Sequence, residues 1–95
     1  MRRIEAKIRS GLENKGIKCQ SVYQMPDPDD VRVLLAFNSR DNNKLSPAKI
    51  ERALNSLGVG AFSVPSEFQR LSAAFLHLEV TLGARTERRV VHSAT

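Results

Sequence analysis

The stretches AKIRSGLENKGIKCQSV at residues 6–22 and AKIERALNSLGVGAFSV at residues 48–64 align without a gap. Seven of their seventeen positions carry the same residue, and Gly16 and Gly58 occupy matching positions. A glycine directly after an apolar helical stripe is typical of the left-handed residue that ends a helix. Each stretch therefore predicts a short helix that ends at its glycine and leads into a strand.

The residues before each glycine support a helix. Ile4, Ile8 and Leu12 lie four residues apart and form one narrow apolar face. Ser46 and Pro47 begin the second helix, because serine is a favoured N-cap residue and proline is tolerated in the first turn. The sequence thus indicates two short amphipathic helices.

Two strands are expected after each helix. Residues 17–24 and 31–37 show alternating patterns, and the sequence MPDPDD between them is rich in turn-forming residues. Residues 59–64 and 74–82 are the corresponding strands after the second helix. The stretch PSEFQRLS between those two strands is expected to be a loop or a single helical turn.

The order helix–strand–strand thus occurs twice, which indicates an internal duplication with units at about 3–38 and 46–83. Chance similarity of two short capped helices is the alternative. We expect an α+β fold, a pseudo-duplicated αββ-αββ arrangement in which two helices cover one face of a four-stranded antiparallel sheet. The weaker strands should lie at the edges. The expected strand order across the sheet is 17–24, 31–37, 74–82, 59–64.

The chain of 95 residues is expected to form a single domain at 1–84, followed by a basic C-terminal tail at 85–95. Its net charge of +5 sits at the two ends, since the residues between 19 and 84 carry six basic and seven acidic side chains. Basic termini suit the phosphates of a nucleic acid or an acidic protein partner, although they also occur as solvated surface. The residues expected to make such contacts are Arg2, Arg3, Lys7, Arg9, Arg85, Arg88 and Arg89.

The sheet face opposite the helices is the predicted interaction surface. Strand alternation places several apolar side chains on it, and contiguous exposed apolar surface usually marks an interface, most economically with a second copy of the chain. The expected interface residues are Val22, Arg32, Leu34, Phe62, Phe75 and His77. A slip of one residue in register would instead bury them. Exposed Phe62 and Phe75 would also allow unpaired bases to stack on this face.

No catalytic residue, cofactor or metal site is expected. Cys19 and His77 fall on opposite faces of the predicted sheet, so they cannot act as a pair. The chain has no Cys-x-x-Cys or His-x-x-x-His spacing, and its acidic turn at residues 27–30 lacks the ligand pattern of a calcium loop. The glycines of GVGAF follow a helix instead of preceding one, which does not fit a phosphate-binding loop.

The function predicted from these features is non-enzymatic protein–protein interaction. The chain would be a subunit of a larger assembly, such as a viral or mobile-element particle, or an inhibitor of a partner protein. The alternative is nucleic-acid binding without sequence specificity, through the first helix and the basic tail. A single cysteine and the lack of a long apolar run predict no disulfide and no membrane partner, and the expected location is the cytoplasm or a particle assembled there. No small-molecule partner is indicated.

Overall fold

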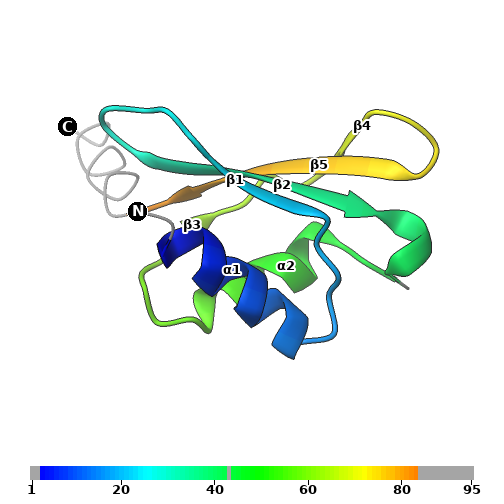
Figure 1. Ribbon diagram of the computed structural model, residues 1–95, viewed down its shortest axis with the longest axis horizontal. Helices are drawn as coiled ribbons and strands as arrows, with labels where there is room; N and C mark the ends of the chain where they lie inside the picture. The colour runs from blue at the N-terminus through cyan, green and yellow to red at the C-terminus, as the bar shows by residue number, and fades with distance from the viewer. Residues whose placement is uncertain (1–2, 43, 84–95) are drawn as a thin grey trace.

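The computed structural model describes residues 3–42 and 44–83. Two helices pack side by side against one face of an antiparallel sheet, and the opposite face carries no helix (Figure 1). The protein is therefore an α+β fold with two layers. In chain order the elements are α1 (Arg3–Asn14), β1 (Ser21–Met25), β2 (Val31–Asn38), the 3-10 helix η1 (Ser39–Asp41), α2 (Pro47–Asn55), β3 (Phe62–Ser63), β4 (Gln69–Arg70) and β5 (Phe75–Leu82).

The ends of both helices follow the sequence signals. Gly16 and Gly58 have φ angles of +79° and +77°, so the left-handed residues predicted after the helices are confirmed. After α1, the Ile17 N–H donates to the Leu12 carbonyl at 2.9 Å, which draws the chain back over the last turn. At the start of α2, the Ser46 hydroxyl accepts from the backbone N–H of the third helical residue at 3.2 Å.

The sheet has five strands, so the prediction of four strands is wrong. Its order is β1-β2-β5-β3, and β4 also pairs with β5. The additional strand falls in the stretch predicted as a loop or a helical turn, where Gln69 lies opposite His77 and Arg70 opposite Leu76. A strand of two residues is too short to show any alternation, so the sequence carries no signal for it.

The core lies between the sheet and the two helices. The long central strands β2 and β5 pair in a register that sets Leu35 opposite Leu78. Every second side chain of each strand points to the helices and is nearly inaccessible to solvent: Val33, Leu35, Phe37, Leu76, Leu78 and Val80. The helices contribute their apolar stripes to the same core, through Ile8, Leu12, Ile50, Ala53 and Leu54.

One backbone N–H on each of the edge strands β1 and β3 is bound by a helix side chain. The outward N–H of Gln24 in β1 donates to Glu5 Oε2 of α1 at 2.7 Å. The N–H of Phe62 in β3 donates to Asn55 Oδ1 of α2 at 2.8 Å. A capped N–H cannot bind the carbonyl of an added strand, so each helix protects the edge strand beside it.

Candidate protein interface

The uncovered side of the sheet begins with an irregularity in β1. The Gln20 N–H donates to the Ala36 carbonyl at 2.8 Å, while Ser21 is the registered partner of the same residue. Two consecutive residues therefore face one residue of β2, which is the arrangement of a β-bulge. Because a bulge reverses the alternation of the strand after it, Tyr23 points away from the helices and Val22 points toward them.

Val22 was predicted on the uncovered face, and that placement is wrong. Its partner across the strands is the buried Leu35, and its side chain packs against the core. The alternation counted from Ile17 and Cys19, which are both buried, does not continue through the bulge.

Phe62 was also predicted on the uncovered face, and the structure places it in the core with 4% of its surface exposed. A strand was expected from residue 59, but residues 58–61 are not in a strand. Gly60 has a φ angle of +134°, which turns the chain before β3 begins. Phe62 then lies opposite Leu82 and fills the edge of the core.

The remaining predicted interface residues, Arg32, Leu34, Phe75 and His77, alternate with buried residues of β2 and β5 and lie on the side away from the helices. The register assigns further side chains to the same surface. We call this surface the open face: Ser21, Tyr23, Met25, Arg32, Leu34, Ala36, Phe75, His77, Glu79 and Thr81.

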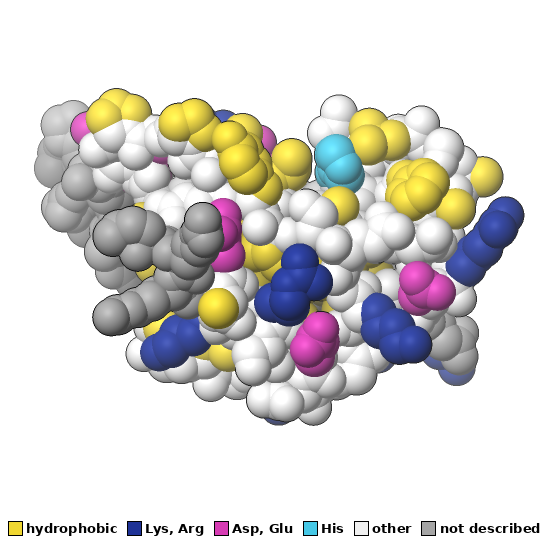
Figure 2. Space-filling view, in the orientation of Figure 1, with side chains coloured by type: hydrophobic (Ala, Val, Ile, Leu, Met, Phe, Trp, Pro, Cys, Tyr) yellow, Lys and Arg dark blue, Asp and Glu magenta, His cyan; other side chains and the backbone are white. Residues whose placement is uncertain are grey.

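The open face is apolar over much of its area. Tyr23 lies directly opposite Leu34, and the exposed fractions of Tyr23 and Phe75 are 52% and 43%. Hydrophobic side chains gather along the upper margin of Figure 2, which is the sheet side of the molecule, on both sides of a histidine. Most of the Lys and Arg side chains visible in that view lie below this margin. Solvent-exposed aromatic side chains at such density are typical of interaction surfaces.

Arg32 is the single Lys or Arg of the open face, and it is paired with two carboxylates. Its Nε donates to Glu79 Oε2 at 2.9 Å, its Nη2 also contacts Glu79, and its Nη1 donates to Asp27 Oδ2 at 3.2 Å. Hydrogen bonds from the Asp30 and Asp29 N–H groups, with a smaller contribution from Arg32, hold the pKa of Asp27 below its ordinary value. This surface therefore offers no unpaired Lys or Arg to a phosphate.

The predicted phosphate-contact residues are not assembled by the described part of the chain. Lys7 is exposed on α1, whereas the Arg9 Nη1 donates to the Cys19 carbonyl at 2.8 Å and helps to fix the chain after α1. Only the helical backbone of Arg3 is described. Four of the predicted residues lie outside the described residues: Arg2, Arg85, Arg88 and Arg89.

Cys19 is buried, and its Sγ contacts the carbonyls of Ser21 and Ala36 at 3.2 and 3.5 Å. Burial raises the pKa of this thiol, so the unreactive protonated form predominates at neutral pH. Within residues 3–42 and 44–83, no group of three His, Cys, Asp or Glu side chains could hold a metal ion. No helix in the same ranges is long and apolar enough to cross a membrane.

Comparison with protein-family models, with curated proteins and with solved structures finds no match for this chain.

Proposed function

We propose that the protein is a non-enzymatic interaction module that docks on another protein chain through its open face. The observation that carries this proposal is the exposure of Tyr23 and Phe75, with the half-buried Leu34 opposite Tyr23, on a sheet face that no helix covers. The partner is a second copy of the chain or a different protein. In either case the chain would act as a subunit of an assembly or as an inhibitor bound to its target.

The protected edges support docking on the face instead of strand addition. Strand addition needs free N–H and carbonyl groups along an edge. Glu5 already binds one N–H of β1 and Asn55 binds one N–H of β3, and Pro65 soon follows the two residues of β3. A partner would therefore bury the side chains of the open face, and the ion pairs of Arg32 would form the polar part of the interface.

Placing a charged side chain on the open face tests this proposal. Leu34→Lys and Phe75→Lys change partly or largely exposed side chains, so the fold should survive while association is lost. Glu51→Lys is the matched control, because Glu51 is exposed on α2, away from the open face. Light scattering after size exclusion should give a mass above that of the monomer for the wild type and the control, and monomer mass for both open-face variants.

For a partner other than a second copy, the same three variants are used as bait in a pull-down, and circular dichroism verifies that each is folded. A partner held by wild type and Glu51→Lys but lost from both open-face variants supports the proposal. A wild type that stays monomeric at high concentration and retains no protein, or association that survives both open-face substitutions, contradicts it.

We further infer that the two halves of the chain, about 3–38 and 46–83, descend from one duplicated αββ unit. Leu35 and Leu78 occupy corresponding positions in the two halves and lie directly opposite each other, as a pseudo-twofold axis between β2 and β5 requires. Each half also ends its helix with a left-handed glycine, and each helix caps its own edge strand. The halves differ after the second helix, where β3 is short and β4 is added.

Nucleic-acid binding without sequence specificity is the second candidate. The excess of positive charge at residues 1–18, including the exposed Lys7, favours it. Binding to a random oligonucleotide should then weaken steeply as salt rises, and alanine at Arg85, Arg88 and Arg89 should weaken it further. Lack of binding at low salt would exclude this candidate.

A further inference from the structure

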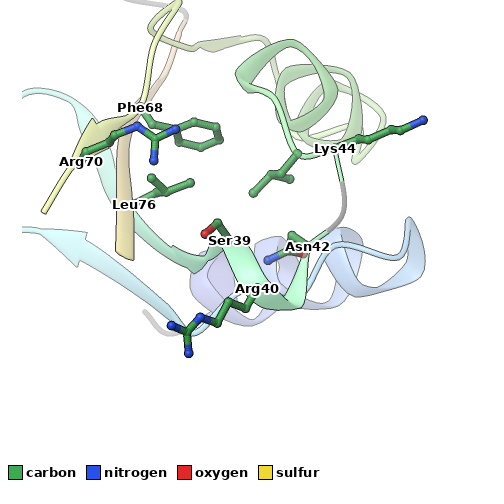
Figure 3. A pocket seen from close by; sticks show the side chains of 8 residues that line it. Ser39, Arg40, Asn42, Lys44, Phe68, Arg70 and Leu76 are labelled. Atoms are coloured by element: carbon green, nitrogen blue, oxygen red, sulfur yellow. The ribbon is translucent and has the colours of Figure 1, made fainter. Parts of the chain in front are cut away.

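A cavity of about 470 Å³ opens at the end of the sheet where β2 runs into η1. Figure 3 shows Phe68, Arg70 and Leu76 on one side of it and Ser39 and Asn42 on the other. This volume is within the range of pockets that bind small molecules. The cavity is separate from the open face, because Leu76 points to the helix side of β5. Among the described residues, the lining consists of Ser39, Arg40, Asn42, Lys44, Leu45, Phe68, Arg70 and Leu76.

One part of the cavity wall is apolar and held in place by the core. Leu76 is buried, and Leu45 and Phe68 pack against the core while they line the cavity. The Phe68 ring meets the Phe37 ring edge to face, with centroids 6.0 Å apart and planes at 70°. The wall is therefore preformed, and an apolar group that enters displaces water from it without reordering the core.

The charged residues of the cavity are all cationic. Arg40, Lys44 and Arg70 contribute three positive charges, and no Asp or Glu of residues 3–42 and 44–83 lines the space. Among the described residues, none of these three forms an ion pair. The guanidinium of Arg70 is directed along the cavity beside Phe68 in Figure 3, while the ends of Arg40 and Lys44 extend away from it. Arg70 is thus the cation placed to bind a ligand directly, and the other two raise the positive potential at its rim.

Of the two neutral polar side chains among the described residues that line the cavity, Asn42 binds backbone groups of the protein, and Ser39 is available to a ligand. The side chain of Asn42 is fully used, because its Oδ1 accepts from the Lys18 N–H at 2.7 Å and its Nδ2 donates to the carbonyls of Lys18 and Asn38 at 2.9 and 3.0 Å. The hydroxyl of Ser39 makes no hydrogen bond within the described part of the chain. Ser39 is therefore the free hydroxyl donor beside Arg70 and Leu76.

We propose that this cavity binds an organic anion, a carboxylate carried on an aromatic or branched apolar body. Arg70 binds the carboxylate through its guanidinium, Ser39 donates a hydrogen bond to it, and Phe68, Leu45 and Leu76 cover the apolar body. The cationic side and the apolar wall of the cavity are both required for selectivity. An inorganic anion leaves the apolar wall exposed to water. A neutral apolar molecule leaves the guanidinium of Arg70 without a bound anion.

The test is a titration of the full-length ¹⁵N-labelled protein with phenylacetate, followed by its backbone amide signals. Phenylacetamide is the neutral analogue of the same shape, and inorganic phosphate is the anion without an apolar body. Phenylacetate should give saturable shifts centred on Ser39, Arg70 and Leu76. Phenylacetamide and phosphate should each bind about tenfold more weakly or not at all, because each lacks one of the two contacts.

The variant Arg70→Gln keeps a side chain of similar length without the charge, and it should weaken phenylacetate binding about tenfold. Arg52→Gln is the matched control, since Arg52 is exposed on α2 and does not line the cavity, and it should leave the affinity unchanged. The spectrum of each unliganded variant verifies its fold.

The proposal would be overturned by equal affinity for phenylacetate and phenylacetamide, by an affinity that Arg70→Gln leaves unchanged, or by shifts spread over the open face. The absence of any saturable shift would overturn it as well. Because association through the open face is measured by mass with different variants, failure of this titration does not affect the proposed function.

Discussion

Asn42 holds the chain after β2 to the chain after α1. It is the one buried polar residue in the described core, with 7% of its surface exposed, and it binds both the N–H and the carbonyl of Lys18. A carboxamide is the side chain that can accept and donate in this way at once. Asn42 therefore substitutes for a strand partner where residue 18 has none.

Asn42→Ala should destabilise the protein by about 1–3 kcal/mol, because it leaves backbone groups of Lys18 and Asn38 without their partners at a partly buried position. Urea unfolding measures the change in the free energy of unfolding. Asn14→Ala, an exposed position at the end of α1, is the control and should stay within about 0.5 kcal/mol of wild type. Equal stability of the two variants would show that water replaces the amide at residue 42.

Asp27 makes the stability of the β1–β2 turn depend on pH. Its carboxylate accepts from the Asp29 and Asp30 N–H groups at 2.8 and 3.0 Å and binds Arg32, and these contacts lower its pKa from the ordinary 3.8. A lowered pKa in the folded state means that the ionised carboxylate stabilises the fold above pH 3.8, and that this stabilisation is lost as the pH falls through 3.8 toward the lowered value.

The variant Asp27→Asn cannot ionise, so it should lose less stability than wild type on acidification. Urea midpoints measured at about pH 5 and about pH 2 give the comparison, because carboxylate linkage acts in this interval. The variant should have a lower urea midpoint than wild type at the higher pH. The difference between the two midpoints should be smaller at the lower pH. The exposed control Asp41→Asn should follow the wild-type profile. A constant difference between Asp27→Asn and wild type would contradict the prediction.

At the scale of the elements, α1 packs at Gly11 against Leu57, which follows the end of α2. A methyl group added to Gly11 would collide with Cδ2 of Leu57 and lie 3.2 Å from its Cγ. Glycine is otherwise a poor helix residue, less favourable than alanine by about 1 kcal/mol. Glycine at this position therefore lowers the helix propensity of α1 but leaves room for the side chain of Leu57.

Gly11→Ala should destabilise the wild-type background by about 1–3 kcal/mol through overpacking, and stabilise the Leu57→Ala background by about 1 kcal/mol through helix propensity. A double-mutant cycle in urea measures this reversal of sign. The same effect of Gly11→Ala in both backgrounds would show that Leu57 moves aside without cost.

The elements that could be predicted from sequence are those with their own local signals. The helix ends at Gly16 and Gly58 depend on a backbone conformation that glycine favours, so a single residue decides each. The faces of β1 and β3 could not be predicted, because the bulge at Gln20 and the turn at Gly60 shift the alternation by contacts with distant strands. The cavity residues also come from three separate segments, and none of these carries a motif.

At the scale of the whole molecule, the pairing of β2 with β5 joins two halves that are far apart in the sequence. Val33 lies opposite Val80, and Phe37 lies opposite Leu76, around the central pair Leu35 and Leu78. Neither half has a complete core alone, since the helix-facing side chains of each central strand pack beside those of the other. The domain should therefore unfold as one cooperative unit.

The proposed duplication adds a sharper expectation for the fragment of residues 1–44. As a monomer it exposes the inner edge of β2 and part of the apolar face around Leu35, so it should be largely unfolded. A second copy can replace β5, because an antiparallel pair of β2 strands about Leu35 reproduces the pairing of Leu35 with Leu78.

Circular dichroism measures the helix content of the fragment, and sedimentation equilibrium measures its mass. Both the helix content and the fraction of dimer should rise together as the concentration of the fragment increases. Leu35→Lys in the fragment should abolish both signals, since it places a charge at the centre of the paired strands. A fragment that folds as a monomer, or one that stays disordered and monomeric at every concentration, would contradict a twofold relation between the halves.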